Sequence, residues 1–436
     1  MRSIGSAAFG IVLIAAVLIT PTTAQKLLVT GKRPLPMMES IGPQVIQLSL
    51  PPFEGAHAIW GSTGQSADGH LWFGVTAQGS SIPSAHLFEY DSSADRFTDR
   101  GDVVGQLTAA GVLRKGEHQA KIHSRILQGP DNYLYFASMD EEGEREDGSQ
   151  LPRWGGHLWR MNLATYKWEH LVATPEALIA VGAGDRYVYA LGYFGHVLFQ
   201  FDTTTRDIRR IPVGSLGGHV SRNFVVDYRG HAYVPRLRAE PSSLGRVAAR
   251  VSIVEFGTNL EELKETPLEA EHYFDTSLTG THGITGLQET SDGSWYFTTH
   301  VGFLYRIQPP ARSSTFDHSA ATVSRVSWLH PNGQMYVASL FSSDGSDTLL
   351  ALSHNILGDG ATGRYQWLTL DLKNNVSRVA PFAAGNMDDS FVGRMLLYGS
   401  STRDSQGNHY VVGIAPNGAK GEAPIVFRVA PRKRGA

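Results

Sequence analysis

The chain carries a recurring pattern in which a polar turn is followed by a short run of alternating aromatic and aliphatic residues. The turns are built on Gly, Asp or Asn, and the alternation has the period of two that is typical of a β-strand. Seven copies of the pattern begin at Ala67, Pro130, Gly184, Asp227, Ser291, His330 and Ser405. Regular repetition of strands and turns indicates an all-β repeat fold.

Most copies are followed by a second strand-like run with its own turn. These runs begin at His86, His157, His196, Val251, Phe303, Thr348 and Ile425. Two hairpins per repeat, at a spacing of about 40 to 70 residues, match the four-stranded antiparallel blades of a propeller. The pattern therefore predicts an all-β, seven-bladed β-propeller.

A propeller forms one domain because each blade buries its faces against its neighbours and the ring must close. We expect a single propeller domain over residues 25–436, with its blades between about 55 and 430. A strand from residues 44–50, or from part of 26–30, is expected to complete the last blade. Helical periodicity is nearly confined to residues 259–270, for which a short helix is predicted.

The first 24 residues have the pattern of a secretory signal peptide. Arg2 precedes an apolar run from Ala7 to Ile19, and a small residue, Ala24, ends the segment before Gln25. The apolar run is short for a membrane span. We expect cleavage after Ala24 and a secreted or periplasmic protein without a membrane anchor, and an uncleaved anchor is the alternative.

Composition narrows the possible chemistry. The chain has 436 residues, of which 42% are hydrophobic, and a net charge of −3. This balance allows a large core and argues against general nucleic-acid binding. The chain has no Cys, which excludes disulfides, thiolate metal sites and cysteine nucleophiles. We expect a monomer.

A few polar residues do not follow the repeat. His123 has no equivalent in the other blades, and Tyr193 lies at a turn between strands, although a buried structural His and a packed core Tyr are the simpler interpretations of each. Between residues 206 and 250 the chain has nine Arg, and Arg222 and the pair Arg236 and Arg238 fall near strand ends that are expected to face the cleft. Guanidinium groups there point to an anionic ligand. By contrast, the histidines that begin three of the second runs recur in one position, so packing is their default role.

Four segments together resemble a known family. Lys-Ile-His-Ser-Arg at 121–125, Gly-Gly-His-Leu-Trp-Arg-Met-Asn at 155–162, the Tyr-x-Gly-His turn at 193–196 and His-Val-Ser-Arg-Asn at 219–223 resemble the seven-bladed propeller polysaccharide lyases, chiefly the ulvan lyases. They are also similar to the related propellers that act on rhamnosyl-glucuronate ends of plant gums. The resemblance covers roughly residues 60–305. The acidic insertion at residues 140–150 departs from the family's pattern and is expected to form a surface loop beside or over the site.

The resemblance implies a lyase site. In these lyases a His and a Tyr handle the proton transfers, while an Arg and further His residues hold the uronate carboxylate. It implies His123 and Tyr193 as the catalytic pair. It also implies Arg222 as the carboxylate binder and His157 as a site member. The other expected substrate-binding residues are His219 and, from the basic stretch that also contains Arg222, Arg236 and Arg238.

The expected reaction is β-elimination at a uronic acid, a glucuronate linked to rhamnose as in ulvan or gum arabic. The proton on C5 is removed, the sugar on O4 leaves, and a guanidinium on the carboxylate stabilises the negative charge that develops. His123, with an ordinary pKa of about 6.5, can accept the proton while Tyr193 protonates the leaving oxygen. Alternatively, a deprotonated Tyr193 carries out both transfers with His123 in support.

Two other function classes remain open. One is a glycoside hydrolase acting on the same glycans, with Glu89, Asp140, Glu141 and Glu289 as generic carboxylate candidates. The other is a non-catalytic propeller that binds a glycan or a protein. No cofactor is expected to be required. A divalent metal, structural or catalytic, is an open possibility if the scattered His219, His231, His282 and His300 converge.

Overall fold

The computed structural model describes residues 31–430 apart from 146, 218–220, 242–246, 274–282, 312–318, 344–346, 355–364, 383–393, 399–400 and 418–420. Its described elements are nearly all β-strands, as the period-two pattern predicts. Among these described residues, none of the helices has the length and apolar character that a membrane crossing requires.

The first strands of the ring form one ten-stranded sheet. Two groups of strands are joined in it by a parallel pairing of β4 with β9, in which Gly64 faces Ile126. A Cβ on Gly64 would lie 1.8 Å from the Ile126 carbonyl oxygen, so the junction requires glycine. The strands are β3 (Ala56–Ala58), β4 (Thr63–Gln65), β5 (Leu71–Ala77), β6 (His86–Asp91), β7 (Arg96–Asp102), β8 (Lys121–Ile122), β9 (Ile126–Gln128), β10 (Tyr133–Met139), β11 (Gly156–Asn162) and β12 (Trp168–Thr174).

The next three sheets each have four strands that pair antiparallel in chain order. The first consists of β13 (Leu178–Gly184), β14 (Tyr187–Gly192), β15 (Val197–Asp202) and β16 (Ile208–Pro212). The second consists of β17 (Val225–Val226), β18 (Ala232–Pro241), β19 (Val247–Phe256) and β20 (Glu262–Pro267). The third consists of β21 (Ile284–Glu289), β22 (Trp295–Thr299), β23 (Phe303–Gln308) and β24 (Thr322–Trp328).

The last two sheets each take a strand from the beginning of the chain. One contains β25 (Tyr336–Ser342), β26 (Thr348–His354), β27 (Gln366–Asp371) and β28 (Val376–Pro381), with β1 (Leu35–Met38) parallel to β28. The other contains β29 (Leu396–Tyr398), β30 (His409–Pro416), β31 (Glu422–Ala430) and, antiparallel to β31, β2 (Gln44–Leu48). The predicted completion of the last sheet by residues 44–50 is confirmed.

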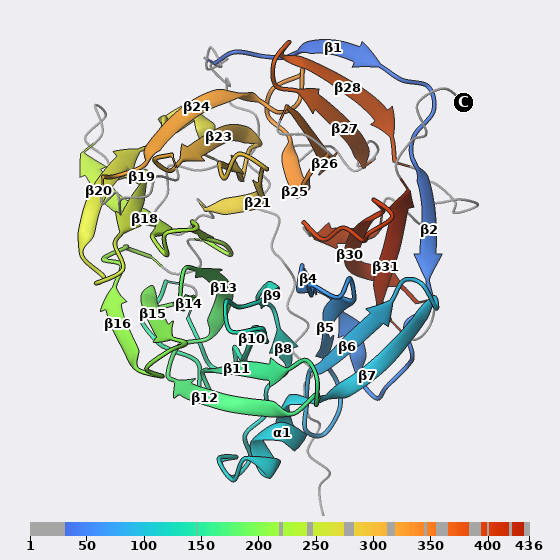
Figure 1. Ribbon diagram of the computed structural model, residues 1–436, viewed down its shortest axis with the longest axis vertical. Coiled ribbons are helices and arrows are strands. Elements are labelled where there is room, and N and C mark those ends of the chain that lie inside the picture. The colour runs from blue at the N-terminus through green and yellow to red at the C-terminus, as the bar shows by residue number, and fades with distance from the viewer. Residues whose placement is uncertain are drawn as a thin grey trace, which may run out of the picture. The chain divides into compact units, whose positions relative to one another are not determined.

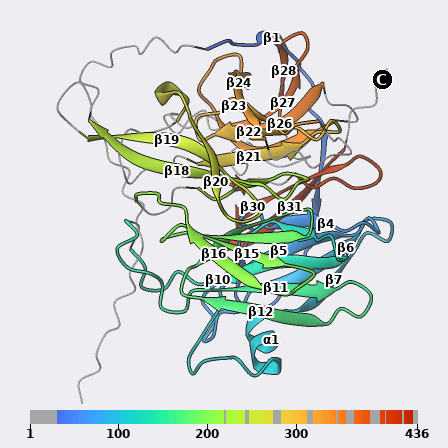
Figure 2. The same cartoon turned by 60° about the vertical axis from the view of Figure 1, so that its left-hand side comes forward.

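The sheets follow one another around a ring, with strands such as β4, β9, β21 and β25 toward the middle and strands such as β7, β12, β16 and β24 at the rim (Figure 1). The long β18–β19 hairpin extends beyond the other strands (Figure 2). Adjacent sheets pack face to face; Leu191 of β14, Val226 of β17 and Val254 of β19 belong to one buried cluster. Strands buried on both faces explain the aromatic and aliphatic runs in the sequence.

The predicted helix at residues 259–270 is wrong. Residues Glu262–Pro267 form strand β20, which pairs with β19, and only Ala270–His272 form a short 3-10 helix. A described α-helix that was not predicted, α1 (Val103–Ala109), follows β7. Asp102 caps it by accepting a hydrogen bond from the Gly105 backbone N–H at 2.8 Å. Seven residues are too few for a helical period to stand out in the sequence.

One copy of the recurring pattern lies one strand out of phase. The turn at His330 and Gly333 leads into β25, which is the first strand of its sheet, whereas the turns at Ala67 and Pro130 lead into second strands. The run that begins at Thr348 is therefore the second strand of its sheet and not the third. The short connection from β24 to β25 contains the same kind of polar turn that joins strands within the other sheets, so sequence alone does not separate them.

Candidate functional site

His123 lies in the short segment of the chain that connects strands β8 and β9. Its side chain is 9% exposed, and its ring lies parallel to that of Trp60, with 6.4 Å between the centroids. Burial lowers the pKa of His123 well below its usual value, and the positive charges of Arg222 and Lys121 lower it further. His123 is therefore neutral at neutral pH, with a lone pair that can accept a hydrogen bond or a proton.

Tyr193 and Arg222 are in direct contact. Tyr193 follows β14, Arg222 precedes β17, and the Arg222 Nε–H donates a hydrogen bond to the Tyr193 hydroxyl oxygen at 3.3 Å. The pKa of Arg222 is raised chiefly by its interaction with Tyr193, against the opposing effect of burial. A guanidinium beside a phenol oxygen stabilises the phenolate form. The structure thus brings the three residues His123, Tyr193 and Arg222 into one electrostatic neighbourhood.

Three aromatic residues that the sequence did not indicate as site members complete this neighbourhood. Tyr336 begins β25 and Tyr398 ends β29, and both interact with the Arg222 charge. Burial raises the pKa of Tyr398 to about 12, although Arg222 acts to lower it. Trp60 packs against Tyr398 with 4.9 Å between ring centroids. We call His123, Tyr193, Arg222, Trp60, Tyr336 and Tyr398 the central cluster.

The acidic insertion reaches the edge of the central cluster. Glu141 forms an ion pair with Lys121, whose ammonium lies 5.5 Å from the Trp60 ring centroid. The loop carries both exposed and buried carboxylates: Glu142 is half exposed and Asp140 is buried. The expectation that this segment lies beside the site agrees with the contact between Glu141 and Lys121.

His157, which the resemblance implies as a site member, has the environment of a structural histidine. It is 1% exposed, its Nδ1 lies 2.9 Å from His170 Nε2, and its Nε2 lies 3.0 Å from Glu117 Oε1. Both ring nitrogens are therefore occupied. His196, at the same repeat position, is also buried and bonds the Gly217 carbonyl oxygen at 2.7 Å. Packing, the default role for these recurring histidines, fits both environments.

Arg236 and Arg238 do not belong to the central cluster, because carboxylates on the outer strand of their own sheet bind them. Arg236 is 2% exposed, donates to the Val213 carbonyl oxygen at 2.6 Å and pairs with Glu265 at 3.0 Å. Arg238 is half exposed and pairs with Glu265 at 3.0 Å. His219 lies outside the described residues, as does His282.

The four carboxylates considered for a hydrolase each have a different environment. Glu89 pairs with Arg100 and His70, Glu141 with Lys121, and Asp140 with His118. Glu289 acts at longer range on Arg125.

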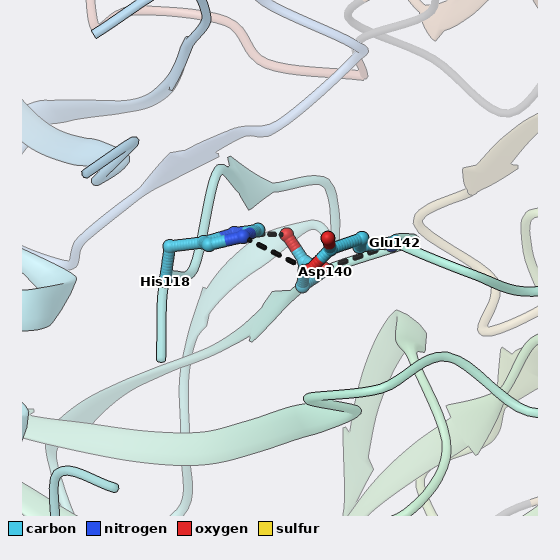
Figure 3. A group of neighbouring side chains, drawn as sticks. All are labelled: His118, Asp140 and Glu142. Atoms are coloured by element: carbon cyan, nitrogen blue, oxygen red, sulfur yellow. Dashed lines mark hydrogen bonds and ion pairs between the residues drawn. The ribbon is translucent and has the colours of Figure 1, made fainter. Parts of the chain in front are cut away.

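One group of side chains has a donor set that suits a cation (Figure 3). His118 Nδ1 lies 2.8 Å from Asp140 Oδ2, and His118 Nε2 lies 3.2 Å from Glu142 Oε2. Imidazole and carboxylate ligands suit zinc and similar divalent ions. Here both ring nitrogens of His118 face carboxylates, so the three side chains contact one another as a triad. Of the scattered histidines, His231 bonds Glu255 at 2.8 Å inside its own sheet.

Comparison with known proteins supports the architecture. No family model and no curated protein matches the chain. The β-propeller domain of Cps50 (Swd1) from Myceliophteria thermophila is similar in structure, with 11% identity, a TM-score of 0.50 and coverage of 88% of this chain and 100% of that one. The RRP9 WD40 repeats match with 9% identity, a TM-score of 0.50 and coverage of 90% and 100%. At such identities the likeness shows the fold alone, and the chain is an all-β protein with a β-propeller fold.

Proposed function

We propose that the propeller has seven blades. Five of them correspond to the four-stranded sheets and to the sheet of β25 to β28. The ten-stranded sheet then counts as two blades, one of β4 to β7 and one of β9 to β12, joined where β4 pairs with β9. This division agrees with the seven recurring turns in the sequence.

We propose that the central cluster is the active site of a polysaccharide lyase that cleaves the bond to O4 of a uronic acid, a glucuronate linked to rhamnose as in ulvan or gum arabic. The observation that carries the proposal is the 3.3 Å hydrogen bond from Arg222 to Tyr193, together with His123, whose pKa is lowered by burial and by the charge of the same Arg222. A guanidinium has five N–H donors; the Arg222 Nε–H donates to Tyr193, and Arg222 also hydrogen bonds Tyr398. The remaining donors have the forked geometry that a carboxylate fits.

The residues of the cluster suit the steps of β-elimination. A base removes the C5 proton, the electron pair forms the C4–C5 double bond, the C4–O bond breaks and the leaving oxygen gains a proton. Arg222 stabilises the negative charge that develops on the carboxylate as the C5 proton leaves. Tyr193, as a phenolate held by Arg222, can take the C5 proton and pass it to the leaving oxygen, with neutral His123 in support. In the alternative route His123 takes the C5 proton and Tyr193 donates its own.

The proposal includes export and an anionic partner. Residues 1–24 have the pattern of a signal peptide, which fits an enzyme that acts on extracellular polysaccharide. The enzyme would act as a monomer and require no cofactor. The triad of His118, Asp140 and Glu142 is the group that would hold a structural divalent ion.

A second candidate is a propeller that binds the same glycans without cleaving them. The observation in its favour is the small exposed fraction of the two proposed catalytic side chains, 9% for His123 and 3% for Tyr193. A polysaccharide would then contact Trp60 and Lys121 at the edge of the cluster, where an aromatic ring and a cation lie together. Turnover separates the two candidates.

The test is ultraviolet absorbance during incubation of the mature protein with ulvan and, separately, with gum arabic. Elimination leaves a conjugated double bond in the uronate and hydrolysis does not. The proposal expects absorbance to rise with at least one glycan. New reducing ends without a rise would establish a hydrolase, and binding of either glycan without turnover would establish the second candidate.

A further inference from the structure

A narrow pocket is lined by residues that lie close in sequence to members of the central cluster. Its wall includes Gly61, Arg125, Asn223, Gly286, Leu340 and Ser401. Gly61 follows Trp60, Arg125 lies two residues after His123, and Asn223 follows Arg222. The same inner segments therefore supply residues to both the central cluster and the pocket.

Arg125 is the positively charged residue of this wall. Its Nη2 donates a hydrogen bond to Ser401 Oγ at 3.2 Å, and its guanidinium carbon lies 5.7 Å from the Trp295 ring centroid. Within the described ranges, no carboxylate forms an ion pair with Arg125. Burial lowers the pKa of Arg125 to about 10, and the distant charge of Glu289 offsets this only in part. A guanidinium in a pocket with so few acceptors is favourable only when an anion or water supplies them.

The other polar groups of the wall have partners within the protein. The amide of Asn223 donates to the Thr285 carbonyl oxygen at 3.1 Å, and the Thr285 hydroxyl lies 2.9 Å from that of Thr298. Gly286 keeps the wall thin, because a Cβ there would lie 2.9 Å from the Leu340 Cβ. The space left is enough for one or two water-sized groups, such as the two oxygens of a carboxylate.

We propose that this pocket binds a carboxylate, through Arg125, at a subsite separate from the Arg222 contact. The site goes beyond the proposed lyase function and does not depend on it. A carboxylate accepts two parallel hydrogen bonds from one guanidinium, and Ser401 next to Arg125 offers a third donor. The ligand is either a free carboxylate or a carboxylate of the polysaccharide.

The test is thermal unfolding of the mature protein in sodium acetate at constant ionic strength, with sodium chloride as the balancing salt. We expect acetate to raise the melting temperature of the wild type and of Arg222→Gln. The Kd for acetate, taken from the dependence of this shift on concentration, should be at least tenfold lower for these two proteins than for Arg125→Gln. Arg238→Gln is the matched control and should respond as the wild type does. Equal stabilisation of Arg125→Gln and the wild type, or none in either, would overturn the proposal.

A second variant covers the case in which Arg125→Gln does not fold. Arg125→Lys keeps the charge and loses the fork, so its acetate Kd should weaken severalfold, and an unchanged Kd would equally overturn the proposal. The source of the carboxylate is found from inhibition. Acetate raises KM for the glycan more in the wild type than in Arg125→Gln if the pocket takes a substrate carboxylate, and by the same factor in both if it takes a free one. Without any turnover the lyase proposal fails, while the acetate result still decides the pocket.

Discussion

The protonation state of His123 follows from its neighbours and makes activity depend on pH in a definite way. Burial, Arg222 and Lys121 all lower its pKa. In the route in which His123 takes the C5 proton, His123 must be neutral, so that route is lost as the pH falls through this lowered pKa. We expect kcat/KM to stay high below pH of about 6.5, the ordinary pKa of histidine, and to decline at a clearly lower pH.

The measurement is the pH dependence of kcat/KM on uronate-containing glycan, with the His123 titration followed by NMR. Replacing Lys121 by Gln removes one of the three causes and should raise the pKa of His123. An acidic limb at or above about 6.5, or no response to Lys121→Gln, would contradict this account of the site.

At the residue scale, sequence was informative where a side chain broke the repeat. His123 and Tyr193 stand out for that reason, and they lie near Arg222 in the structure. Tyr336 and Tyr398 were missed because an aromatic residue in a strand is ordinary propeller composition. Only the meeting of inner strands in space distinguishes these two from core tyrosines.

Among the elements, the acidic insertion has a predicted effect on binding. Glu141 neutralises Lys121 beside Trp60, so an anionic glycan must compete with Glu141 for that ammonium. We expect Glu141→Gln to lower KM by roughly two- to fivefold with little change in kcat, since an ion pair of this kind contributes about 0.2–1 kcal/mol.

Asp147→Asn is the matched control. Asp147 is an exposed carboxylate of the same loop, but its contacts are with Ser149 and Arg145 and not with Lys121. The variants are compared by steady-state kinetics at low and high salt, and the gain in Glu141→Gln should shrink as salt screens the charges. Equal KM values for Glu141→Gln and the wild type would show that the loop does not restrict Lys121.

Strand β2 is the other element with a specific expectation. Leu48 is 7% exposed and pairs with Val426 of β31, so β2 closes the last sheet. We expect Leu48→Ala to reduce the free energy of unfolding by about 3 kcal/mol, the usual loss for a buried leucine. Gln47→Ala, on the exposed side of the same strand, should change it by less than about 0.5 kcal/mol. Denaturant unfolding measures both, and equal effects would argue against closure by β2.

The wrong helix prediction at residues 259–270 explains why Arg236 and Arg238 were wrongly expected to bind substrate. Residues 259–270 were predicted to form a helix, which hid the fact that Glu262 and Glu265 lie across a sheet from Arg236. As strand β20 they neutralise Arg236 and Arg238, so these cations no longer suit an anionic ligand. An edge strand with charged residues resembles a surface helix in sequence, and only its pairing with β19 decides between them.

At the scale of the whole molecule, the repeat of turns and strands was enough to predict an all-β propeller. It did not predict that β4 and β9 would join two groups of strands, because that contact depends on the close approach of Gly64 to Ile126. It also misplaced the copy at His330 by one strand, since the link from one sheet to the next resembles a hairpin turn. Local patterns predict strands, whereas the contacts between sheets arise only when the ring closes.

The most direct test of the central claim is the rate of ultraviolet absorbance change on ulvan or gum arabic for the wild type, Tyr193→Phe and Tyr187→Phe. Tyr187 is the control: it begins strand β14, which ends one residue before Tyr193, and its hydroxyl accepts a hydrogen bond from the surface residue Arg186. We expect the absorbance to rise with the wild type and with Tyr187→Phe, and the rate to fall at least 100-fold in Tyr193→Phe, because a proton-transfer group is removed. A Tyr193→Phe protein as active as the wild type would contradict the central claim.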